Sequence, residues 1–158
     1  MKALNYAVLG YGGRGRGYTQ YALAHPNENN VKAVIETDLK KLDVHPVEGA
    51  KIYSDLDAFI AEKPDLDIVC IATQDTQHYE HAIKVMKAGY DIMLEKPISN
   101  KLDECRGILR ESIKLGRKVF VCHVLRYTDF YKAVKDVLVR GGVGKVINMQ
   151  TEENVGYW

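Results

Sequence analysis

Short apolar runs alternate along this chain with longer segments whose apolar residues recur at helical spacing. Six of the runs share strand length and a high content of β-branched residues. They are Tyr6 to Gly10, Val31 to Ile35, Lys51 to Tyr53, Asp67 to Ala72, Asp91 to Leu94 and Lys118 to Cys122. Strands that alternate with helices are typical of βαβ units, whose strands pair in parallel. The alternation therefore predicts an α/β fold with a doubly wound parallel sheet in the order 3-2-1-4-5-6.

The segments between the runs carry the start and stop signals of crossover helices. Apolar residues recur at helical spacing from Tyr79 to Met86 and from Leu102 to Ile113, and a glycine follows each segment where a left-handed cap belongs. Ser54 stands at the expected start of another helix. We therefore expect helices on both faces of the sheet.

Composition places the chain among ordinary globular proteins. Of its 158 residues, 46% are hydrophobic and 27% charged, and 22 basic side chains nearly balance 21 acidic ones. Such a balance provides no broad positive field for nucleic acid or an anionic membrane. The apolar runs are too short for a membrane span or a signal peptide, so we predict a cytoplasmic protein. The three cysteines lack metal-ligand spacing, so we expect free thiols and no metal site.

The pattern changes after Cys122. Residues from Arg126 to Arg140 have the spacing of an amphipathic helix, and one more strand is expected after Gly144, in GGVGKVINMQTEENV. We therefore predict a Rossmann domain at residues 1–125. Residues 126–158 would then be the hinge helix and first strand of an incomplete substrate domain.

The first predicted strand runs directly into a GxGxxG motif, from Gly10 to Gly15, which opens a helix. Gly10 permits a tight turn, Gly12 lets the backbone approach a pyrophosphate, and Gly15 lets helix and strand pack closely. Glu36 ends the second strand 21 positions after Gly15. Strand, helix and acid together favour a dinucleotide site over a glycine-rich loop without a ligand.

Glu36 stands where a carboxylate can accept hydrogen bonds from the adenosine ribose and repel a 2′-phosphate, which favours NAD over NADP. Lys40 and Lys41 follow closely and would soften that repulsion. The alternative for Glu36 is a solvated acid at the end of a strand. Arg14 and Arg16 either approach the pyrophosphate or point into solvent.

A Glu-Lys-Pro tripeptide, Glu95 to Pro97, ends the fifth strand, where open α/β sheets bind their ligands. Lys96 could exchange a proton with a substrate hydroxyl or carbonyl there, if its pKa is lowered toward neutrality. The alternative is an ordinary surface lysine.

These motifs resemble the amino-terminal half of the Gfo/Idh/MocA family, which includes glucose-fructose oxidoreductase and inositol dehydrogenase. The resemblance lies in AVLGYGGRGRG, VKAVIETD, DIVCIATQDTQHYEHAIKVMKAGYDIMLEKPIS and, less sharply, VCHVLRYTDFYKAVKDVL with GGVGKVINMQTEENVGYW. It implies that Lys96 binds substrate and assists proton transfer. Where the family commonly has Thr-Pro-Asn, this chain has Thr73-Gln74-Asp75, which puts the contacts of the changed pair in doubt.

The resemblance also implies that Thr73 and His78 line the cofactor, and that Arg126 either contacts substrate or holds the hinge. Together, motif and resemblance predict one catalytic residue, Lys96. The predicted cofactor-binding residues are Gly10, Gly12, Gly13, Arg14, Gly15, Glu36, Thr73, Gln74, His78 and Glu95.

The function this implies is the cofactor-binding part of an NAD-dependent dehydrogenase acting on a sugar, polyol or similar hydroxy compound. The alternatives are an NAD-dependent glycosidase of the same superfamily and a non-catalytic NAD-binding module. A methyltransferase is disfavoured, because Glu-Lys-Pro would have no role in it. We expect the chain to bind cofactor without turnover, with self-association through its last strand as one option.

Overall fold

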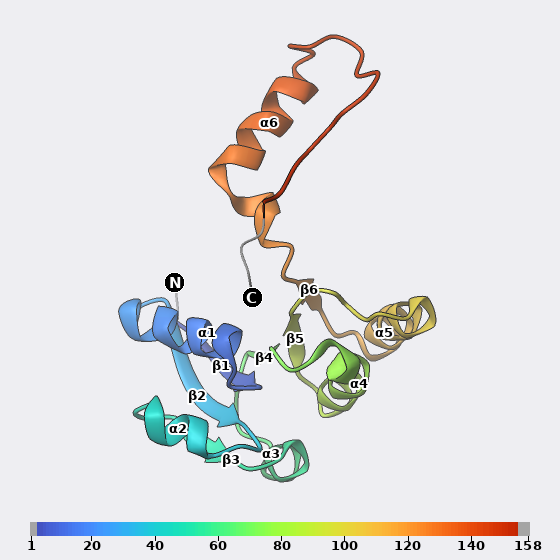
Figure 1. Cartoon of the computed structure of the whole chain (residues 1–158). Helices are drawn as coiled ribbons and strands as arrows, with labels where there is room; N and C mark the ends of the chain where they lie inside the picture. The colour runs from blue at the N-terminus through green and yellow to red at the C-terminus, as the bar shows by residue number, and fades with distance from the viewer. Residues whose placement is uncertain (1–2, 155–158) are drawn as a thin grey trace. The chain divides into compact units, whose positions relative to one another are not determined.

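The structure, a computed structural model, describes residues 3–154. The chain divides into two compact units between Cys122 and His123. The first unit holds a six-stranded sheet in which every neighbouring pair is parallel, in the order β3-β2-β1-β4-β5-β6 (Figure 1). This order confirms the predicted doubly wound α/β fold.

The strands of this sheet are β1 (Leu4–Leu9), β2 (Asn29–Ile35), β3 (Lys51–Tyr53), β4 (Ile68–Ile71), β5 (Asp91–Leu94) and β6 (Val119–Val121). The limits of β3 and β5 match the prediction, and the others differ by one or two residues. β2 begins early because Asn29 and Asn30 pair with Leu4 and Asn5 of β1. Backbone pairing therefore extends the strand into residues whose side chains are polar.

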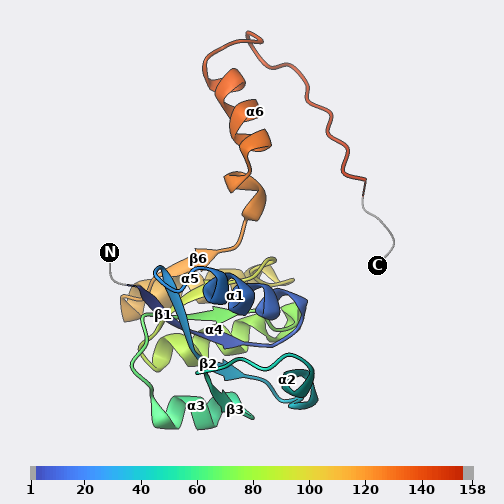
Figure 2. The ribbon, with the colours of Figure 1, turned by 90° about the vertical axis from the view of Figure 1, so that its left-hand side faces the viewer.

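The helices of the first unit are α1 (Gly13–Ala24), α2 (Lys40–Val44), α3 (Leu56–Glu62), α4 (His78–Lys87) and α5 (Leu102–Leu115), with a short 3-10 helix η1 (Asp75–Gln77). They lie on both sides of the sheet (Figures 1 and 2). α3 begins one residue later than predicted from Ser54, because Asp55 is the residue that caps it. The Asp55 carboxylate accepts a hydrogen bond of 2.7 Å from the amide of Ala58.

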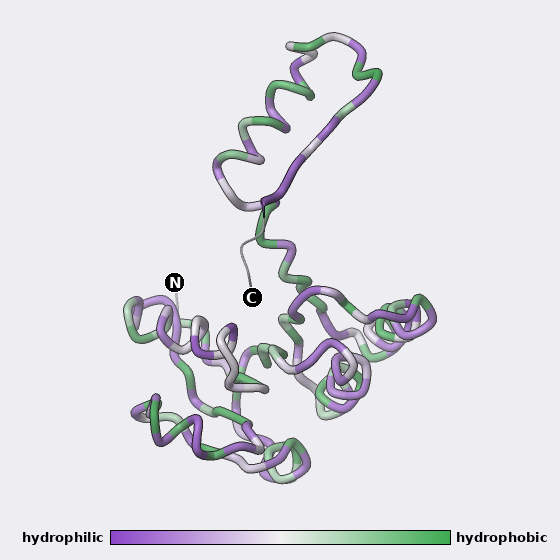
Figure 3. The backbone as a smooth tube through the Cα atoms, viewed as in Figure 1, coloured by the Kyte–Doolittle hydropathy of each residue, from purple (hydrophilic) through white to green (hydrophobic). Residues whose placement is uncertain are grey.

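Alternate residues of the strands supply two separate apolar layers. On one face, Ala7 and Leu9 of β1 join a core that includes Phe59 of α3 and Val85 of α4. On the other face, Val8 joins a smaller cluster with residues of α1, β4 and β5. The central strands are buried on both sides, and Figure 3 shows their largely hydrophobic composition.

The second unit contains a 3-10 helix η2 (Val124–Tyr127) and α6 (Asp129–Val139). The predicted helix from Arg126 is interrupted at Thr128, whose backbone is extended, and hydrophobic and polar residues alternate along α6 (Figure 3). The strand predicted after Gly144 is wrong for residues 141–154, which the structure describes without a strand. A strand needs a neighbour for its backbone groups, and the described part of this unit offers none. Val155, at the end of that predicted strand, lies outside the described residues.

Candidate functional site

The glycine-rich turn joins β1 to α1 in a conformation that requires glycine at two positions. Gly10 has a φ of +92°, and a Cβ there would lie 2.8 Å from the carbonyl oxygen of Ala72. A Cβ on Gly15 would lie 2.1 Å from the carbonyl oxygen of Gly10. The turn and the helix start are therefore packed backbone against backbone, as the motif predicts.

Gly12 and Gly13 differ from these two, because a Cβ on either would meet nothing within 4 Å. Gly12 is the N-cap residue of α1, and no side chain caps this helix end. The first amide groups of a helix have no partner within the helix, and they carry partial positive charge. The open space beside these amides is therefore suited to an anionic group.

Glu36 lies directly after β2 and is 6% exposed. One oxygen of its carboxylate accepts a hydrogen bond of 2.7 Å from the amide of Tyr11 and lies 3.0 Å from Nζ of Lys41. The other oxygen accepts a hydrogen bond of 2.9 Å from the amide of Asp38 and one of 3.4 Å from the hydroxyl of Thr37. Burial raises the pKa of Glu36, but these amides and the Lys41 ammonium outweigh it, so the pKa is lowered and the carboxylate is ionised at neutral pH.

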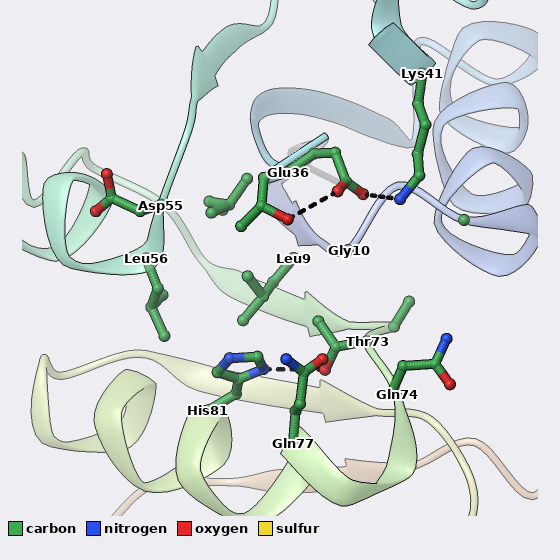
Figure 4. A pocket seen from close by; sticks show the side chains of 14 residues that line it. Leu9, Gly10, Glu36, Lys41, Asp55, Leu56, Thr73, Gln74, Gln77 and His81 are labelled. Atoms are coloured by element: carbon green, nitrogen blue, oxygen red, sulfur yellow. Dashed lines mark hydrogen bonds and ion pairs between the residues drawn. The ribbon is translucent and has the colours of Figure 1, made fainter. Parts of the chain in front are cut away.

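A pocket of about 320 Å³ opens where β1, β2 and β4 end (Figure 4). Leu9, Ile35 and Leu56 supply its apolar surface, and the other side chains around it are mostly polar. The predicted site residues that line it are Gly10, Gly12, Glu36, Thr73 and Gln74. The carboxyl ends of parallel strands on either side of a reversal in strand order form the usual ligand crevice of such sheets.

Five polar lining residues were not predicted as site residues: Thr37, Lys41, Asp55, Gln77 and His81. Gln77 and His81 are four positions apart, so they lie on one side of the helical segment that follows β4. His81 Nδ1 lies 3.0 Å from the hydroxyl oxygen of Thr73. The pKa of His81 is lowered, mainly by burial. The nearby Glu80 opposes this shift, and Lys84 and His78 add to it. Helical spacing from His78 was the sequence signal that could have found His81.

His78 does not line this pocket. Its side chain is buried, with Nδ1 2.8 Å from the carbonyl oxygen of Pro97 and Nε2 3.1 Å from that of Thr73. The ring therefore ties the loop after β4 to the loop after β5.

Glu95 and Arg14 meet on the α1 side of the sheet. Glu95 is 6% exposed, accepts a hydrogen bond from the Tyr18 hydroxyl, and lies 3.3 Å from Nε of Arg14. Burial, then hydrogen bonds to Cys122 and Glu95, raise the pKa of Tyr18, which keeps the phenol protonated as a donor. Neither Glu95 nor Arg14 lines the pocket at Glu36.

Lys96 follows Glu95 in an exposed turn, and its peptide bond to Pro97 is cis. Among the residues that the structure describes, no hydrogen bond or ion pair holds its side chain. In the same part of the chain, no group of side chains could hold a metal ion, and no helix is long and apolar enough to cross a membrane.

Comparison with known proteins agrees with this geometry. Residues 4–123 match the family model described as "Oxidoreductase family, NAD-binding Rossmann fold", named for Gfo, Idh and MocA. An inositol 2-dehydrogenase of Pseudomonas savastanoi is 28% identical over 151 residues, which are 90% of this chain and 44% of that protein. The chain thus spans less than half the length of the curated relatives it matches.

Solved structures show the same fold. The WlbA dehydrogenase of Chromobacterium violaceum, in complex with NADH and UDP-GlcNAcA, matches with a TM-score of 0.84 and 21% identity, over 91% of this chain and 42% of that one. A scyllo-inositol dehydrogenase from Lactobacillus casei, with bound NAD(H) and scyllo-inositol, matches with a TM-score of 0.82 and 20% identity, over 90% of this chain and 43% of that one.

Proposed function

Because the chain belongs to the Gfo/Idh/MocA oxidoreductase family, we propose that it forms the cofactor-binding part of an NAD-dependent dehydrogenase. When bound, the cofactor supplies hydride transfer to or from a sugar, polyol or similar hydroxy compound. The observation that carries the proposal is the pocket that brings the ionised Glu36 beside the uncapped start of α1. The inositol dehydrogenases among the relatives support the substrate class.

The residues of the pocket fit the pyrophosphate and the adenosine ribose, the two polar groups at the adenine end of NAD. The amides at the start of α1 would donate to the pyrophosphate, since Gly12 and Gly13 leave the approach open. The Glu36 carboxylate would accept hydrogen bonds from ribose hydroxyls. The apolar surface of Leu9 and Ile35 would contact the adenine ring.

The other predicted cofactor residues would act in two ways. Thr73 and Gln74 line the pocket and would contact the dinucleotide directly. Arg14, His78 and Glu95 are engaged by neighbouring residues and would position the loops that hold it.

Lys96 would serve the substrate. Its exposed position after β5 and its unengaged side chain support this role. In alcohol oxidation, the bound cofactor would take up the hydride, and the Lys96 side chain would accept the proton of the substrate hydroxyl. In the reverse reaction, Lys96 would return that proton.

Calorimetric titration with NAD and NADP tests the cofactor assignment. We expect tighter binding of NAD, and a loss of NAD affinity of about 1–3 kcal/mol in Glu36→Gln, because a charged hydrogen-bond acceptor is removed. Glu48→Gln, at an exposed position outside the pocket, is the matched control. Equal affinity for the two dinucleotides, or no binding of either, would overturn the assignment.

The role of Lys96 is tested by incubating the protein with NAD and a panel of polyols and following the absorbance of the reduced nicotinamide that forms. In a form of the protein that shows dehydrogenase activity, Lys96→Ala should lower the turnover rate roughly a hundredfold or more. The melting temperature of Lys96→Ala should equal that of wild type. The control Lys87→Ala, at the exposed end of α4, should have the turnover rate of wild type. Full turnover in Lys96→Ala would refute the role. A cytoplasmic location, self-association and the absence of nucleic-acid or membrane partners stay predictions.

A further inference from the structure

The side chain of Lys41 reaches from α2 into the pocket and ends at Glu36 (Figure 4). Its Nζ lies 3.0 Å from the same carboxylate oxygen that accepts the amide of Tyr11. The Lys41 side chain is 43% exposed, whereas that of Glu36 is 6% exposed. The lysine is therefore the movable partner of this pair.

Lys41 competes with ribose for Glu36. An ionised carboxylate offers about four acceptor sites. The amides of Tyr11 and Asp38 and the Lys41 ammonium occupy three of them, and the Thr37 hydroxyl approaches the fourth at 3.4 Å. A ribose that donates two hydroxyl groups to Glu36 must displace Lys41 or Thr37. Lys41 is the easier to displace, because its side chain is 43% exposed and water can solvate the ammonium when it leaves the carboxylate.

A second hollow of about 290 Å³ lies next to this pair. It shares Gly12 and Lys41 with the main pocket and is otherwise lined by Tyr11, Arg16, Val44 and His45. Two of its side chains, Lys41 and Arg16, are basic, and none of its lining residues is acidic. Within the described residues, no hydrogen bond or ion pair engages the Arg16 guanidinium. A phosphate monoester placed beside Glu36 would meet both cations.

From this arrangement we infer that Lys41 is a specificity-determining residue that lets the site accept NADP as well as NAD. The inference rests on the proposed function. With NAD, the ribose takes over the acceptor site that Lys41 leaves. With NADP, Lys41 turns from Glu36 toward the 2′-phosphate, where Arg16 is the second cation. Lys41 thus offsets much of the repulsion between Glu36 and the 2′-phosphate, and the preference for NAD is modest.

Calorimetry with NAD and NADP on three single variants and one double variant tests the inference. Lys41→Ala should raise the ratio of the NADP to the NAD dissociation constant about tenfold, mainly by weakening NADP. Lys40→Ala, one position earlier and outside both hollows, should leave the ratio unchanged. Glu36→Gln should lower the ratio, because it removes the repulsive charge and frees Lys41. Adding Lys41→Ala to that variant should reverse the gain in NADP affinity.

The outcomes separate the inference from the function it rests on. A wild-type chain that binds neither dinucleotide would contradict both the inference and the proposed function. A chain that binds NAD, but whose NADP to NAD ratio is the same in Lys41→Ala as in wild type, would overturn the inference and keep the proposed function. Melting temperatures of all variants show whether each is folded, and Lys41→Ala should melt as wild type because the lysine is partly exposed.

Discussion

Two glycines of α1, two positions apart, should respond to alanine in opposite ways. Gly15 packs against the turn, and a Cβ there would lie 2.1 Å from the Gly10 carbonyl oxygen and 3.1 Å from a methyl of Val8. Ordinary contacts of a Cβ begin at 3.4 Å, so the backbone at Gly15 or Gly10 must shift by about 1 Å. A Cβ on Gly17 would meet nothing within 4 Å.

Both substitutions gain the same intrinsic helix propensity, about 1 kcal/mol. The difference between them is therefore the cost of the contact. Overpacking a well-packed site costs about 1–3 kcal/mol, and we expect the upper end because the atom in the way is backbone. Gly15→Ala should lose about 2 kcal/mol of unfolding free energy, and Gly17→Ala should gain about 0.5–1 kcal/mol. In a chain of this length, the two melting temperatures should differ by roughly 6–12 °C.

Urea and thermal unfolding, followed by circular dichroism, measure this difference. Titration with NAD should show a loss of at least about tenfold in Gly15→Ala, because the turn beside the helix amides moves, which corresponds to about 1.4 kcal/mol. If Gly15→Ala were as stable as Gly17→Ala, then the close approach of α1 to the turn would be wrong, and with it our reading of the motif.

Three further predictions concern the core, a helix cap and pH. Phe59→Ala should cost about 3–5 kcal/mol in urea unfolding, because the ring is fully buried, and a loss below about 1 kcal/mol would contradict that burial. Asp55→Ala should cost about 1 kcal/mol through the lost bond to the amide of Ala58, while Ser54→Ala should be nearly neutral; equal losses would reject the cap. His81 has a lowered pKa, so the unfolded state takes up its proton first as the pH falls below about 6.5, and stability falls with it until the folded-state pKa is passed. His81→Gln should lose less stability than wild type between pH 7.5 and 5.5, and equal losses would assign the slope to other groups.

The sheet order and the glycine-rich turn could be predicted because their signals are local. Each strand is an apolar run bounded by turn residues, and the strand Asp91–Leu94 shows this so clearly that both its limits were predicted correctly. Gly10 and Gly15 are required by backbone contacts that recur with the GxGxxG spacing. Glu36 was predicted as a cofactor-binding residue from its position at the end of the second strand, 21 residues after Gly15.

The remainder of the pocket depends on contacts between segments far apart in the sequence. Asp55 lines the pocket only because β3 pairs with β2 and places the start of α3 there. His78 and His81 lie on one helix, and the packing of the loops after β4 and β5 decides which of them is buried. The strand predicted after Gly144 was wrong for a related reason: β propensity describes a residue, whereas a strand needs a paired neighbour.

The pairing of β1 with β4 also determines when a binding site can exist during folding. Asn5 donates to Asp67 across a separation of 62 positions, at the start of a strand pair that runs from Tyr6 and Ile68 to Leu9 and Ile71. Contacts of such long range are made slowly, because a large loop must close before they form. Leu9 and Ala72 wall the pocket only after this closure, so a dinucleotide has nothing to bind in the earlier, partly ordered chain. Bound cofactor would therefore slow the loss of the native state and leave the rate of reaching it almost unchanged.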